Sequence, residues 1–549
     1  MNAIRDGNHI RVYDAFLAKE SIKEIDGRFY DPDNKAWVVP YSKENAALLG
    51  LLGASLDDSL LSDTKTEDAG DEEPLFPMPI KATPYQHQIK AYNFALHTYG
   101  EDGRSKKEHA LSKGCAFLMD MGTGKTITTI ALAGTLAHKH RIGKLLVVCP
   151  KSIVDVWEQE FAKFADFHYA LAVLVGSTAG KADTIRYMIG TGLQVIVVNY
   201  ESCWRLETEL ARWKPDMIVC DESSKIKNPQ AKCSKALHRL GRISEYNLIL
   251  TGTPITNSPL DFFSQYKFLD NRIFGDSFYS FRARYATLGG FQNHQIVGYK
   301  HLPELVKKAH AIAYRIRIDE AVDLPAFVEE VRPVKLEKAA QQIYDGIEKD
   351  SFAELMNGEI TTRNVLTQLL RLSQVTGGFV RDDAGDDAEQ LSIAKLDALE
   401  DVIDSCMEEG KKVIVFARFV PEIDAIARML RNKGIGYALI KGDVKDRAAQ
   451  VDAFQHDPTC KVFVGQLQTT GMGLTLTAGS VCVYYSLDFS YANYQQSMAR
   501  VRRIGQTKRG VYIHLVAKGT IDEKVMSALK HKGDAAKLLV DDYKKTLGG

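Results

Sequence analysis

The chain has 549 residues, which is enough for about three domains that each bury a core of their own. Its 70 Lys and Arg residues balance its 70 Asp and Glu residues, so any nucleic-acid binding must come from local patches rather than from an overall positive charge. With 45% hydrophobic and 26% charged residues the composition is that of a globular protein, and no apolar run approaches the roughly 20 residues needed to span a bilayer.

The eight cysteines are scattered along the chain and never form a Cys-x-x-Cys pair. Several lie in apolar runs, where a thiol acts as a small hydrophobic group. We therefore expect neither a zinc site nor a disulfide framework, and a reducing compartment fits best. The first six residues lack the apolar core of a signal peptide, so we expect an intracellular protein with no membrane partner.

The chain is predicted to open with a small α+β module over residues 1–55, followed by an acidic flexible linker over residues 56–80. Around Pro32 the sequence predicts two short strands joined by a turn, with a helix over residues 43–52 after them. Trp37 lies in the second strand, and we expect it in the core of the module rather than on DNA. The linker has eight acids and one lysine, and it has too few apolar residues to order itself.

From residue 81 onward, short apolar runs alternate with helical patterns. The runs are continuous rather than alternating, which is typical of parallel strands covered by helices on both faces. They predict two doubly wound α/β lobes over residues 81–276 and 391–549, with a charged helical insertion region over residues 277–390 between them. The first-lobe strands are expected at 115–118, 145–149, 195–198, 217–220 and 248–250. The second-lobe strands are expected at 413–416, 462–464, 481–485 and 511–516, and two helices of the insertion region at 302–312 and 338–349.

Residues 119–126, with the sequence MDMGTGKT, follow the first of these runs and precede a helical pattern. A strand, a glycine-rich turn and a helix are the setting of a phosphate-binding loop, in which backbone N–H groups and the helix dipole face a polyphosphate. Lys125 is expected along the β- and γ-phosphates of the nucleotide, and the Thr126 hydroxyl on Mg²⁺. Met119 stands where the full pattern has its first glycine, so an ordinary strand-to-helix turn with a surface lysine is the alternative. The residues assigned to the nucleotide here are Gly122, Thr123, Gly124, Lys125 and Thr126.

Two carboxylates, Asp221 and Glu222, end another of the predicted strands. Strand ends of a doubly wound sheet open onto the nucleotide crevice, so we expect Asp221 to hold Mg²⁺ through water and Glu222 to orient the attacking water. A solvated acidic turn is the alternative, but the position about 100 residues after a phosphate loop favours a nucleoside triphosphatase. The segment Thr251–Asn257 places small hydroxyl residues at a further strand end, where they can sense the γ-phosphate or simply cap a turn.

The second lobe carries two arginines, Arg500 and Arg503, whose spacing of three places both on one face of a helix. An arginine is always charged and offers a fork of donors that suits a transferring phosphoryl group. A cation from the second lobe would reach that group only when the lobes close, so closure would gate hydrolysis. A solvated basic helix face is the commoner alternative.

Seven segments occur in one order along the chain: 85–86 (YQ), 120–126 (DMGTGKT), 148–152 (VCPKS), 221–224 (DESS), 250–254 (LTGTP), 471–474 (GMGL) and 496–506, which ends in RIGQ. The series resembles the helicase motifs of the Swi/Snf-type ATPases within helicase superfamily two. The resemblance spans most of residues 81–530, and the RIGQ ending is particularly characteristic. The opening module resembles, more weakly, the HARP-type module of annealing helicases, which binds branched DNA.

The resemblance implies two RecA-like P-loop lobes with helical insertions, and ATP and Mg²⁺ as cofactors. It implies that Gln86 reads the adenine, with Gln88 as a nearby competitor. It makes Arg500 and Arg503 arginine fingers, and places Gln496 among the catalytic residues and Gly473 among the nucleotide-binding ones. One departure concerns coupling between ATP and DNA, because Ser224 stands where the family usually has a histidine that helps in it.

We therefore expect an ATP-driven translocase on double-stranded or branched DNA that remodels forks, anneals strands or migrates branches. Phosphate contacts carry no sequence information, so the binding is expected to be independent of sequence and sensitive to salt. The alternatives are a strand-separating helicase and an ATP-dependent displacer of DNA-bound proteins such as RNA polymerase. A monomer is expected, in the cytoplasm of a prokaryotic or phage-infected cell and associated with the nucleoid.

Overall fold

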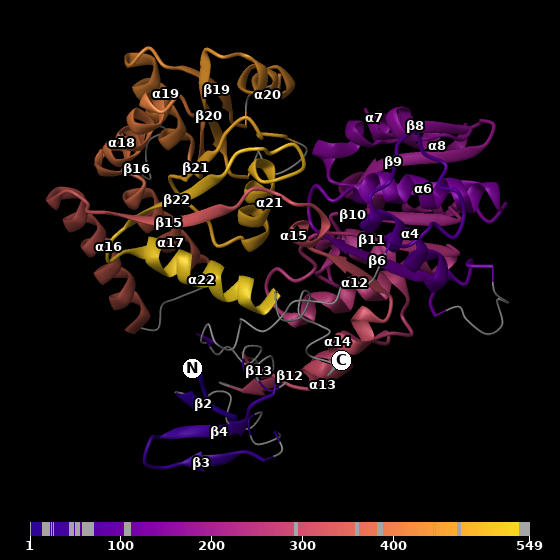
Figure 1. Cartoon of the computed structure of the whole chain (residues 1–549), viewed down its shortest axis with the longest axis horizontal. Coiled ribbons are helices and arrows are strands. Elements are labelled where there is room, and N and C mark those ends of the chain that lie inside the picture. The colour runs from indigo at the N-terminus through magenta and orange to yellow at the C-terminus, as the bar shows by residue number, and fades with distance from the viewer. Residues whose placement is uncertain are drawn as a thin grey trace. The chain divides into compact units, whose positions relative to one another are not determined.

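The computed structural model describes residues 2–13, 22, 25, 27–42, 45, 49, 55–56, 71–103, 111–289, 295–356, 362–381, 388–442, 444, 446–468 and 474–536. The predicted linker and the predicted helix over residues 43–52 lie mostly outside these residues. The chain divides into one compact unit of residues 1–321 with 531–549 and a second unit of residues 322–530. Figure 1 shows both units.

A five-stranded sheet forms the opening module, with the strands in the order β3-β4-β2-β1-β5. The two strands predicted around Pro32 are present as the antiparallel pair β3 and β4, so that prediction is confirmed. Trp37 is half-buried against the core of the module, and its ring centroid lies 5.4 Å from that of Tyr30. The bounds of the strands are β1 (Asn2–Asp6), β2 (His9–Tyr13), β3 (Phe29–Asp31), β4 (Ala36–Pro40) and β5 (Ser55–Leu56).

The first lobe is built on a seven-stranded sheet in the order β14-β6-β11-β10-β7-β9-β8, in which every pair of neighbours is parallel. All five apolar runs predicted as strands of this lobe are strands. The edge strands β8 and β14 were not predicted, because β8 is only half-buried and β14 is short and contains an arginine. The bounds are β6 (Gly114–Met119), β7 (Lys144–Cys149), β8 (Tyr169–Val173), β9 (Leu193–Asn199), β10 (Met217–Asp221), β11 (Tyr246–Leu250) and β14 (Ala313–Ile316).

Helices cover both faces of this sheet (Figure 1). Successive residues of one strand belong to different cores: Val147 is part of the core that includes residues of α4 and α6, and Val148 is part of the core that includes residues of α9 to α12. Burial of each such aliphatic side chain contributes about 1.5–3 kcal/mol, which explains why the strands are continuous apolar runs. The helix bounds are α4 (Gln86–Tyr99), α6 (Lys125–His138), α7 (Val154–Phe164), α8 (Thr178–Arg186), α9 (Tyr200–Arg205), α10 (Glu207–Trp213), α11 (Lys232–Ile243) and α12 (Phe262–Leu269), with short 3-10 turns at η2 (Lys151–Ile153), η3 (Ser223–Ile226) and η4 (Pro259–Asp261).

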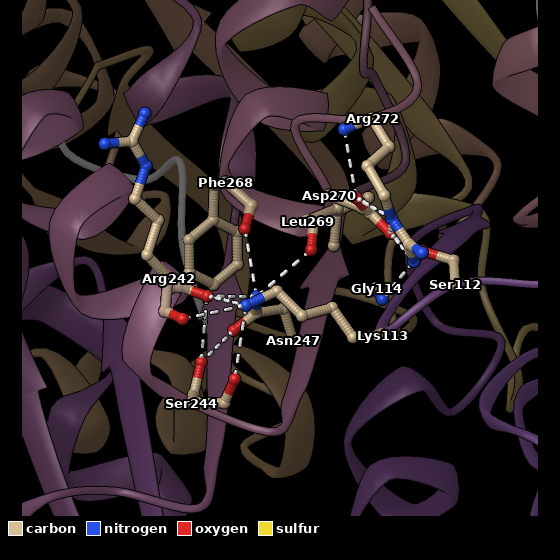
Figure 2. A network of polar contacts seen from close by, with 11 residues as sticks. Ser112, Lys113, Gly114, Arg242, Ser244, Asn247, Phe268, Leu269, Asp270 and Arg272 are labelled. Carbon is tan, nitrogen blue, oxygen red and sulfur yellow. Dashed lines mark hydrogen bonds and ion pairs between the residues drawn. The ribbon is translucent and has the colours of Figure 1, made fainter. Parts of the chain in front are cut away.

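A buried polar network supports the amino end of β11 (Figure 2). The fully buried Asn247 donates to the backbone oxygens of Gly241, Phe268 and Leu269 at 2.8, 3.0 and 3.1 Å. The ammonium group of Lys113 donates to the last carbonyl oxygens of α11, including that of Gly241 at 2.6 Å. These bonds satisfy helix-end carbonyl groups that would otherwise be buried without a partner, so the network anchors α11 and α12 to the sheet.

Residues 277–390 are not one helical region in the structure. Strand β14 completes the first sheet, and β15 begins the second, although the helices predicted at 302–312 and 338–349 are present as α14 and α16. The elements are α13 (Phe278–Tyr285), β12 (Ala286–Gly289), β13 (Gln295–Tyr299), α14 (Leu302–His310), α15 (Ile318–Ala321), β15 (Phe327–Val334), α16 (Lys338–Met356), α17 (Thr362–Thr376), β16 (Phe379–Arg381) and β17 (Ala388–Gln390).

The second lobe has a six-stranded parallel sheet in the order β15-β22-β21-β18-β20-β19, again with a separate core on each face. Its four predicted strands are present, and the predicted α/β fold with two lobes is confirmed. The bounds are β18 (Val413–Ala417), β19 (Gly436–Ile440), β20 (Cys460–Gln466), β21 (Val481–Tyr484) and β22 (Gly510–Ala517), with α18 (Ala394–Glu408), α19 (Val420–Asn432), α20 (Arg447–His456), α21 (Tyr491–Val501) and α22 (Ile521–Ala536).

Within the described residues, no helix is both long and apolar enough to cross a membrane. The same part of the chain contains no cluster of three or more His, Cys, Asp or Glu residues arranged to hold a metal ion. The eight cysteines are free thiols, and seven of them are buried, as the sequence predicted for small hydrophobic residues.

Candidate nucleotide-binding site

The predicted phosphate loop is a turn between β6 and α6. Gly122 and Gly124 have φ angles of 83° and 87°, in the left-handed region that favours glycine. A Cβ atom on Gly124 would lie 2.1 Å from Nε2 of Gln88, so a larger residue there would also displace that side chain. The turn ends directly at the amino terminus of α6, where unpaired N–H groups and the helix dipole favour an anion. The strand, turn and helix predicted here are therefore confirmed.

An ion pair anchors the start of this loop. Oδ1 of Asp120 lies 2.7 Å from Nη1 of Arg315, and Oδ2 accepts a hydrogen bond from the N–H of Ile318 at 3.0 Å. The same Nη1 of Arg315 donates to the oxygen of Leu118 at 2.8 Å, so β14 holds both the strand and the loop. Arg315 was missed at the sequence level because nothing in a short edge strand 197 residues away marks it as a partner of Leu118.

Lys125 occupies the first position of α6, and its ammonium group donates to the oxygens of Met119 and Asp120 at 2.9 and 3.1 Å. Burial lowers the pKa of Lys125, while the neighbouring carboxylates of Glu222, Asp221 and Asp120 oppose that shift. The charged amine is thus held between the phosphate loop and the acidic pair, where a polyphosphate chelated to a divalent cation would fit.

The acidic pair ends β10, and both side chains are buried. Oδ2 of Asp221 accepts from the indole N–H of Trp157 at 3.0 Å, and Oδ1 accepts from the N–H of Glu222 at 3.0 Å. Burial, and then the adjacent charge of Glu222, raise the pKa of Asp221 well above its usual range, whereas Lys125 and the indole bond lower it. Glu222 has a φ of 54°, a strained conformation for a non-glycine residue that costs about 1–3 kcal/mol and is found mostly at functional sites.

A third loop, Thr251–Asn257, lies between the other two. In the sheet, β11 is the neighbour of both β6 and β10, so the loop after β11 separates the phosphate loop from the acidic pair. A Cβ atom on Gly252 would lie 3.3 Å from the oxygen of Met119, which shows how closely the third loop packs on the first. The structure therefore brings Gly122, Thr123, Gly124, Lys125 and Thr126 to the same sheet edge as Asp221 and Glu222.

The two glutamines that are candidates for binding the adenine differ in exposure and in hydrogen bonding. Gln86 is exposed, and its Oε1 accepts from the N–H of Glu72 at 3.0 Å. Gln88 is buried, and its Nε2 donates to the oxygen of Thr123 in the phosphate loop at 3.2 Å. His87 contacts the same oxygen at 2.7 Å through its Nε2. Gln88, the competitor, thus contacts the loop directly, and the role of Gln86 stays a prediction.

The predicted arginine fingers lie in the second unit. Nη1 of Arg500 and Nη1 of Arg503 both donate to the oxygen of Leu474, at 3.4 and 3.3 Å, and the latter also donates to Oγ1 of Thr475 at 2.9 Å. The expectation of one shared helix face is wrong, because α21 ends at Val501 and Arg503 follows it. The chain leaves the helix at an extended Arg502, so convergence on Leu474, rather than helical spacing, brings the two guanidinium groups together.

The remaining candidates of the second unit are only partly described. Gln496 is half-buried within α21. Gly473 lies outside the described residues, as do the two residues before it in the predicted motif. The meeting of any of these groups with Lys125 therefore stays a prediction.

The donor set at the first-lobe sheet edge fits ATP with Mg²⁺. The loop and the amino end of α6 supply backbone N–H groups, and Lys125 supplies a cation. The Thr126 hydroxyl and the Asp221 carboxylate are oxygen ligands of the kind that Mg²⁺ prefers. These are the residues that would hold the nucleotide and its cation.

The chain is similar to known families and proteins over most of its length. Residues 85–377 match the family model of the SNF2-related domain, and residues 394–505 match that of the helicase conserved C-terminal domain. The DNA repair and recombination protein RDH54 of Saccharomyces cerevisiae (strain JAY291) is 26% identical over 486 residues, covering 78% of this chain and 51% of the relative. The SWI/SNF-related matrix-associated actin-dependent regulator of chromatin subfamily A-like protein 1 of Drosophila melanogaster is 28% identical over 435 residues, covering 76% of this chain and 53% of the relative.

The chain thus spans about half the length of these curated relatives. Among solved structures, the Sulfolobus solfataricus SWI2/SNF2 ATPase core in complex with double-stranded DNA is 24% identical, with a TM-score of 0.41, covering 86% of this chain and 99% of that one. The family model of the SNF2-related domain alone covers more than half of the 549 residues. The resemblance in the order of motifs is thereby confirmed, and the chain belongs to the Swi/Snf-type ATPases of helicase superfamily two.

Proposed function

We propose that this ATPase is driven by double-stranded DNA and moves along it, remodelling forks or branched structures. The observation that carries the proposal is the position of Lys125 between the phosphate loop and the buried pair Asp221 and Glu222. Family membership supports DNA as the polymer, since one relative is named as a DNA repair and recombination protein.

The residues of the first lobe divide the chemistry among them. The backbone N–H groups of the phosphate loop and the amine of Lys125 would bind the phosphates, and Thr126 and Asp221 would hold Mg²⁺, which would supply positive charge to offset that of the phosphates. Glu222, whose backbone is strained, would orient the attacking water. Closure of the lobes then brings Arg500 and Arg503 to the γ-phosphate, so turnover depends on the state of both lobes.

DNA contacts in this proposal come from phosphate-binding loops, including Lys151 at the start of η2, which is exposed. In the opening module, Phe29 and Tyr30 are 53% and 49% exposed, and exposed aromatic rings can stack on the unpaired bases of a branch point. We therefore propose that the module directs the ATPase toward forked DNA.

The deciding experiment measures ATP hydrolysis by the full chain with no DNA and with single-stranded, duplex and forked DNA of matched length. Duplex or forked DNA is expected to raise kcat by about tenfold or more, and single-stranded DNA much less. Equal stimulation by single strands would favour a strand-separating helicase. Stimulation without any movement along bare duplex, measured by triplex displacement, would favour a displacer of bound proteins.

Salt dependence tests how the DNA is recognised. Binding through phosphates releases counterions, so the logarithm of the DNA affinity is expected to fall with the logarithm of salt concentration by about 0.9 for each phosphate neutralised. Affinity is also expected to be the same for duplexes of unrelated sequence. Fluorescence anisotropy with two such duplexes across a salt series checks both expectations, and salt-insensitive binding would contradict them.

A further inference from the structure

Two buried aromatic side chains donate hydrogen bonds to Asp221, one to its carboxylate and one to its main chain. Trp157 lies in α7 and Tyr200 is the first residue of α9; they are 1% and 4% exposed. Nε1 of Trp157 donates to Oδ2 of Asp221 at 3.0 Å. The hydroxyl of Tyr200 donates to the backbone oxygen of Asp221 at 2.7 Å. Both the side chain and the main chain of Asp221 are therefore held.

The order of the sheet strands explains why both donors reach the same residue. Strand β7 lies between β10 and β9, and all three run parallel. Helix α7 follows β7 and α9 follows β9, so both helices come after the sheet edge at which β10 ends with Asp221. Trp157 is part of the core that includes residues of α4 and α6, and Tyr200 is part of the core that includes residues of α9 to α12. The two bonds thus come from opposite faces of the sheet.

The bond from Trp157 restricts the orientation of the carboxylate. With its main chain fixed by Tyr200, Asp221 keeps the freedom to rotate about its side-chain bonds. An indole has a single donor and no acceptor, and the ring of Trp157 is fully buried, with its centroid 6.3 Å from that of Phe161. A rotation that breaks the bond to Oδ2 would leave the indole N–H buried without a partner. One orientation of the carboxylate is therefore favoured before any ligand binds.

This orientation matters for a divalent cation. Mg²⁺ demands near-ideal octahedral geometry, so a carboxylate that rotates freely is a poor ligand for it. Groups that donate to a metal-binding carboxylate orient it, and their loss typically costs about 10–100-fold in metal affinity. Within the described part of the chain, Trp157 is the one side chain that donates to the carboxylate of Asp221.

We propose that Trp157 is a positioning residue for Mg²⁺, because its indole N–H holds the carboxylate of Asp221 in the orientation that the metal ion requires. This inference rests on the proposed nucleotide site, in which Asp221 holds Mg²⁺. Trp157 acts through Asp221 and is not itself a ligand of the nucleotide or of the metal ion.

The test compares the removal of two buried indole N–H groups in the full chain. Trp157→Phe keeps a buried aromatic ring but removes the donor. Trp213→Phe is the matched control, because Trp213 is 8% exposed and its Nε1 has no hydrogen-bond partner among the described residues. A third protein carries benzothienylalanine in place of Trp157. Its ring sulfur replaces the N–H in a side chain of nearly the same shape, so the test does not depend on the folding of Trp157→Phe. Thermal unfolding shows which of the proteins fold.

The quantity measured is the affinity for a fluorescent, non-hydrolysable ATP analogue, by anisotropy, with excess Mg²⁺ and with EDTA. When the donor at Trp157 is removed, the affinity with Mg²⁺ is expected to fall about tenfold or more, and the affinity in EDTA to stay within about twofold. With Ca²⁺, whose coordination is more flexible, the loss is expected to be smaller than with Mg²⁺. Trp213→Phe is expected to keep the wild-type affinities under all three conditions.

Two outcomes would overturn the role of Trp157 alone. The first is a wild-type affinity with Mg²⁺ in the benzothienylalanine protein, which would show that the bond does not matter for the metal ion. The second is an equal loss of affinity with Mg²⁺, with Ca²⁺ and in EDTA, which would show that the bond only supports the fold of the site. A wild-type protein whose affinity for the analogue Mg²⁺ does not raise would instead overturn the proposed metal site, and the role of Trp157 with it.

Discussion

Lys125 is the residue whose place best defines the site. It is held between the carbonyl oxygens of its own loop and the carboxylates at the end of β10. Lys125→Ala is expected to lower kcat/KM for ATP by about a thousandfold or more, because the cation that stabilises the transferring phosphoryl group is lost. DNA affinity is expected to stay within about twofold, since the amine of Lys125 is bonded to its own loop.

Steady-state ATPase assays and DNA-binding anisotropy on the same preparation check both halves of that expectation. Lys139→Ala is the control, because Lys139 caps the opposite end of α6 and removing it changes the net charge equally. Wild-type hydrolysis in Lys125→Ala would contradict the assignment of the phosphate loop.

Arg315 shows how a residue can support the site without touching the nucleotide. Arg315→Met keeps the apolar stem but breaks the ion pair with Asp120, whose side chain is 28% exposed. The free energy of unfolding is expected to fall by about 2 kcal/mol, less than for a fully buried pair because water screens Asp120. KM for ATP is expected to rise roughly tenfold, since the start of the loop is no longer fixed.

Urea unfolding and ATP titration measure these two effects. Arg317→Ala serves as the control, because Arg317 follows the same strand and pairs with Glu320 at the surface instead. An unchanged KM in Arg315→Met would show that the loop keeps its shape without the pair.

At the scale of elements, Glu422 at the start of α19 is expected to make the stability of the fold depend on pH. It is the third residue of α19, and its Oε2 accepts from the backbone N–H groups of Arg418 and Phe419 at 3.1 and 3.0 Å. Burial raises the pKa of Glu422 to about 7, against the opposing hydrogen bonds from Ser486 and the backbone. Because the folded state binds this proton more tightly than the unfolded state does, stability falls as pH rises from about 4.5 to about 7.

Glu422→Gln removes this titration while keeping the shape of the side chain. The wild type is expected to lose about 3 kcal/mol relative to the variant between those pH values, which follows from 1.36 kcal/mol per pKa unit. Scanning calorimetry of both proteins across the pH range measures the difference, with Glu409→Gln, an exposed carboxyl in a surface pair, as the control. A difference in melting temperature that does not change with pH would contradict the raised pKa.

The elements that the sequence predicted well are those whose signal is local. Central strands such as β7 and β18 are continuous apolar runs because both of their faces are buried, and that pattern needs no knowledge of the partner. Edge strands such as β14 and β15 are half-exposed and carry polar residues, so tertiary pairing rather than composition makes them strands.

The candidate site shows the same difference between features with a local sequence signal and features that depend on tertiary contacts. A loop such as Gly122–Thr126 is recognisable because strand, turn and helix adjoin in sequence. The partners of the residues at the end of β10 cannot be recognised in this way. Trp157 lies 64 residues from Asp221 and Gln265 lies 42 residues from Ser223, and only the order of the sheet strands brings them together. Arg500 and Arg503 were expected on one helix face, and that expectation is wrong because Arg503 lies beyond the helix; both instead donate to the oxygen of Leu474.

At the scale of the whole molecule, the candidate catalytic groups are divided between the two lobes. The first lobe holds the candidate phosphate-binding groups, whereas Arg500 and Arg503 are held beside Leu474 in the second. If closure completes the site, then Arg500→Ala and Arg503→Ala act on turnover and not on binding. Each is expected to lower the DNA-stimulated kcat by about a thousandfold, as loss of an arginine finger does, with KM for ATP nearly unchanged.

Arg502→Ala is the matched control, because Arg502 lies between the two in sequence but donates to the oxygen of Pro325 within the second lobe. ATPase kinetics at saturating duplex DNA distinguish an effect on turnover from an effect on nucleotide binding. A large rise in KM for ATP, with kcat retained, would mean that the arginines hold the nucleotide in its ground state. Equal effects in all three variants would mean that they only stabilise the second lobe. A selective loss of kcat at positions 500 and 503 would show that turnover needs groups from both lobes, although the candidate phosphate-binding groups lie in the first.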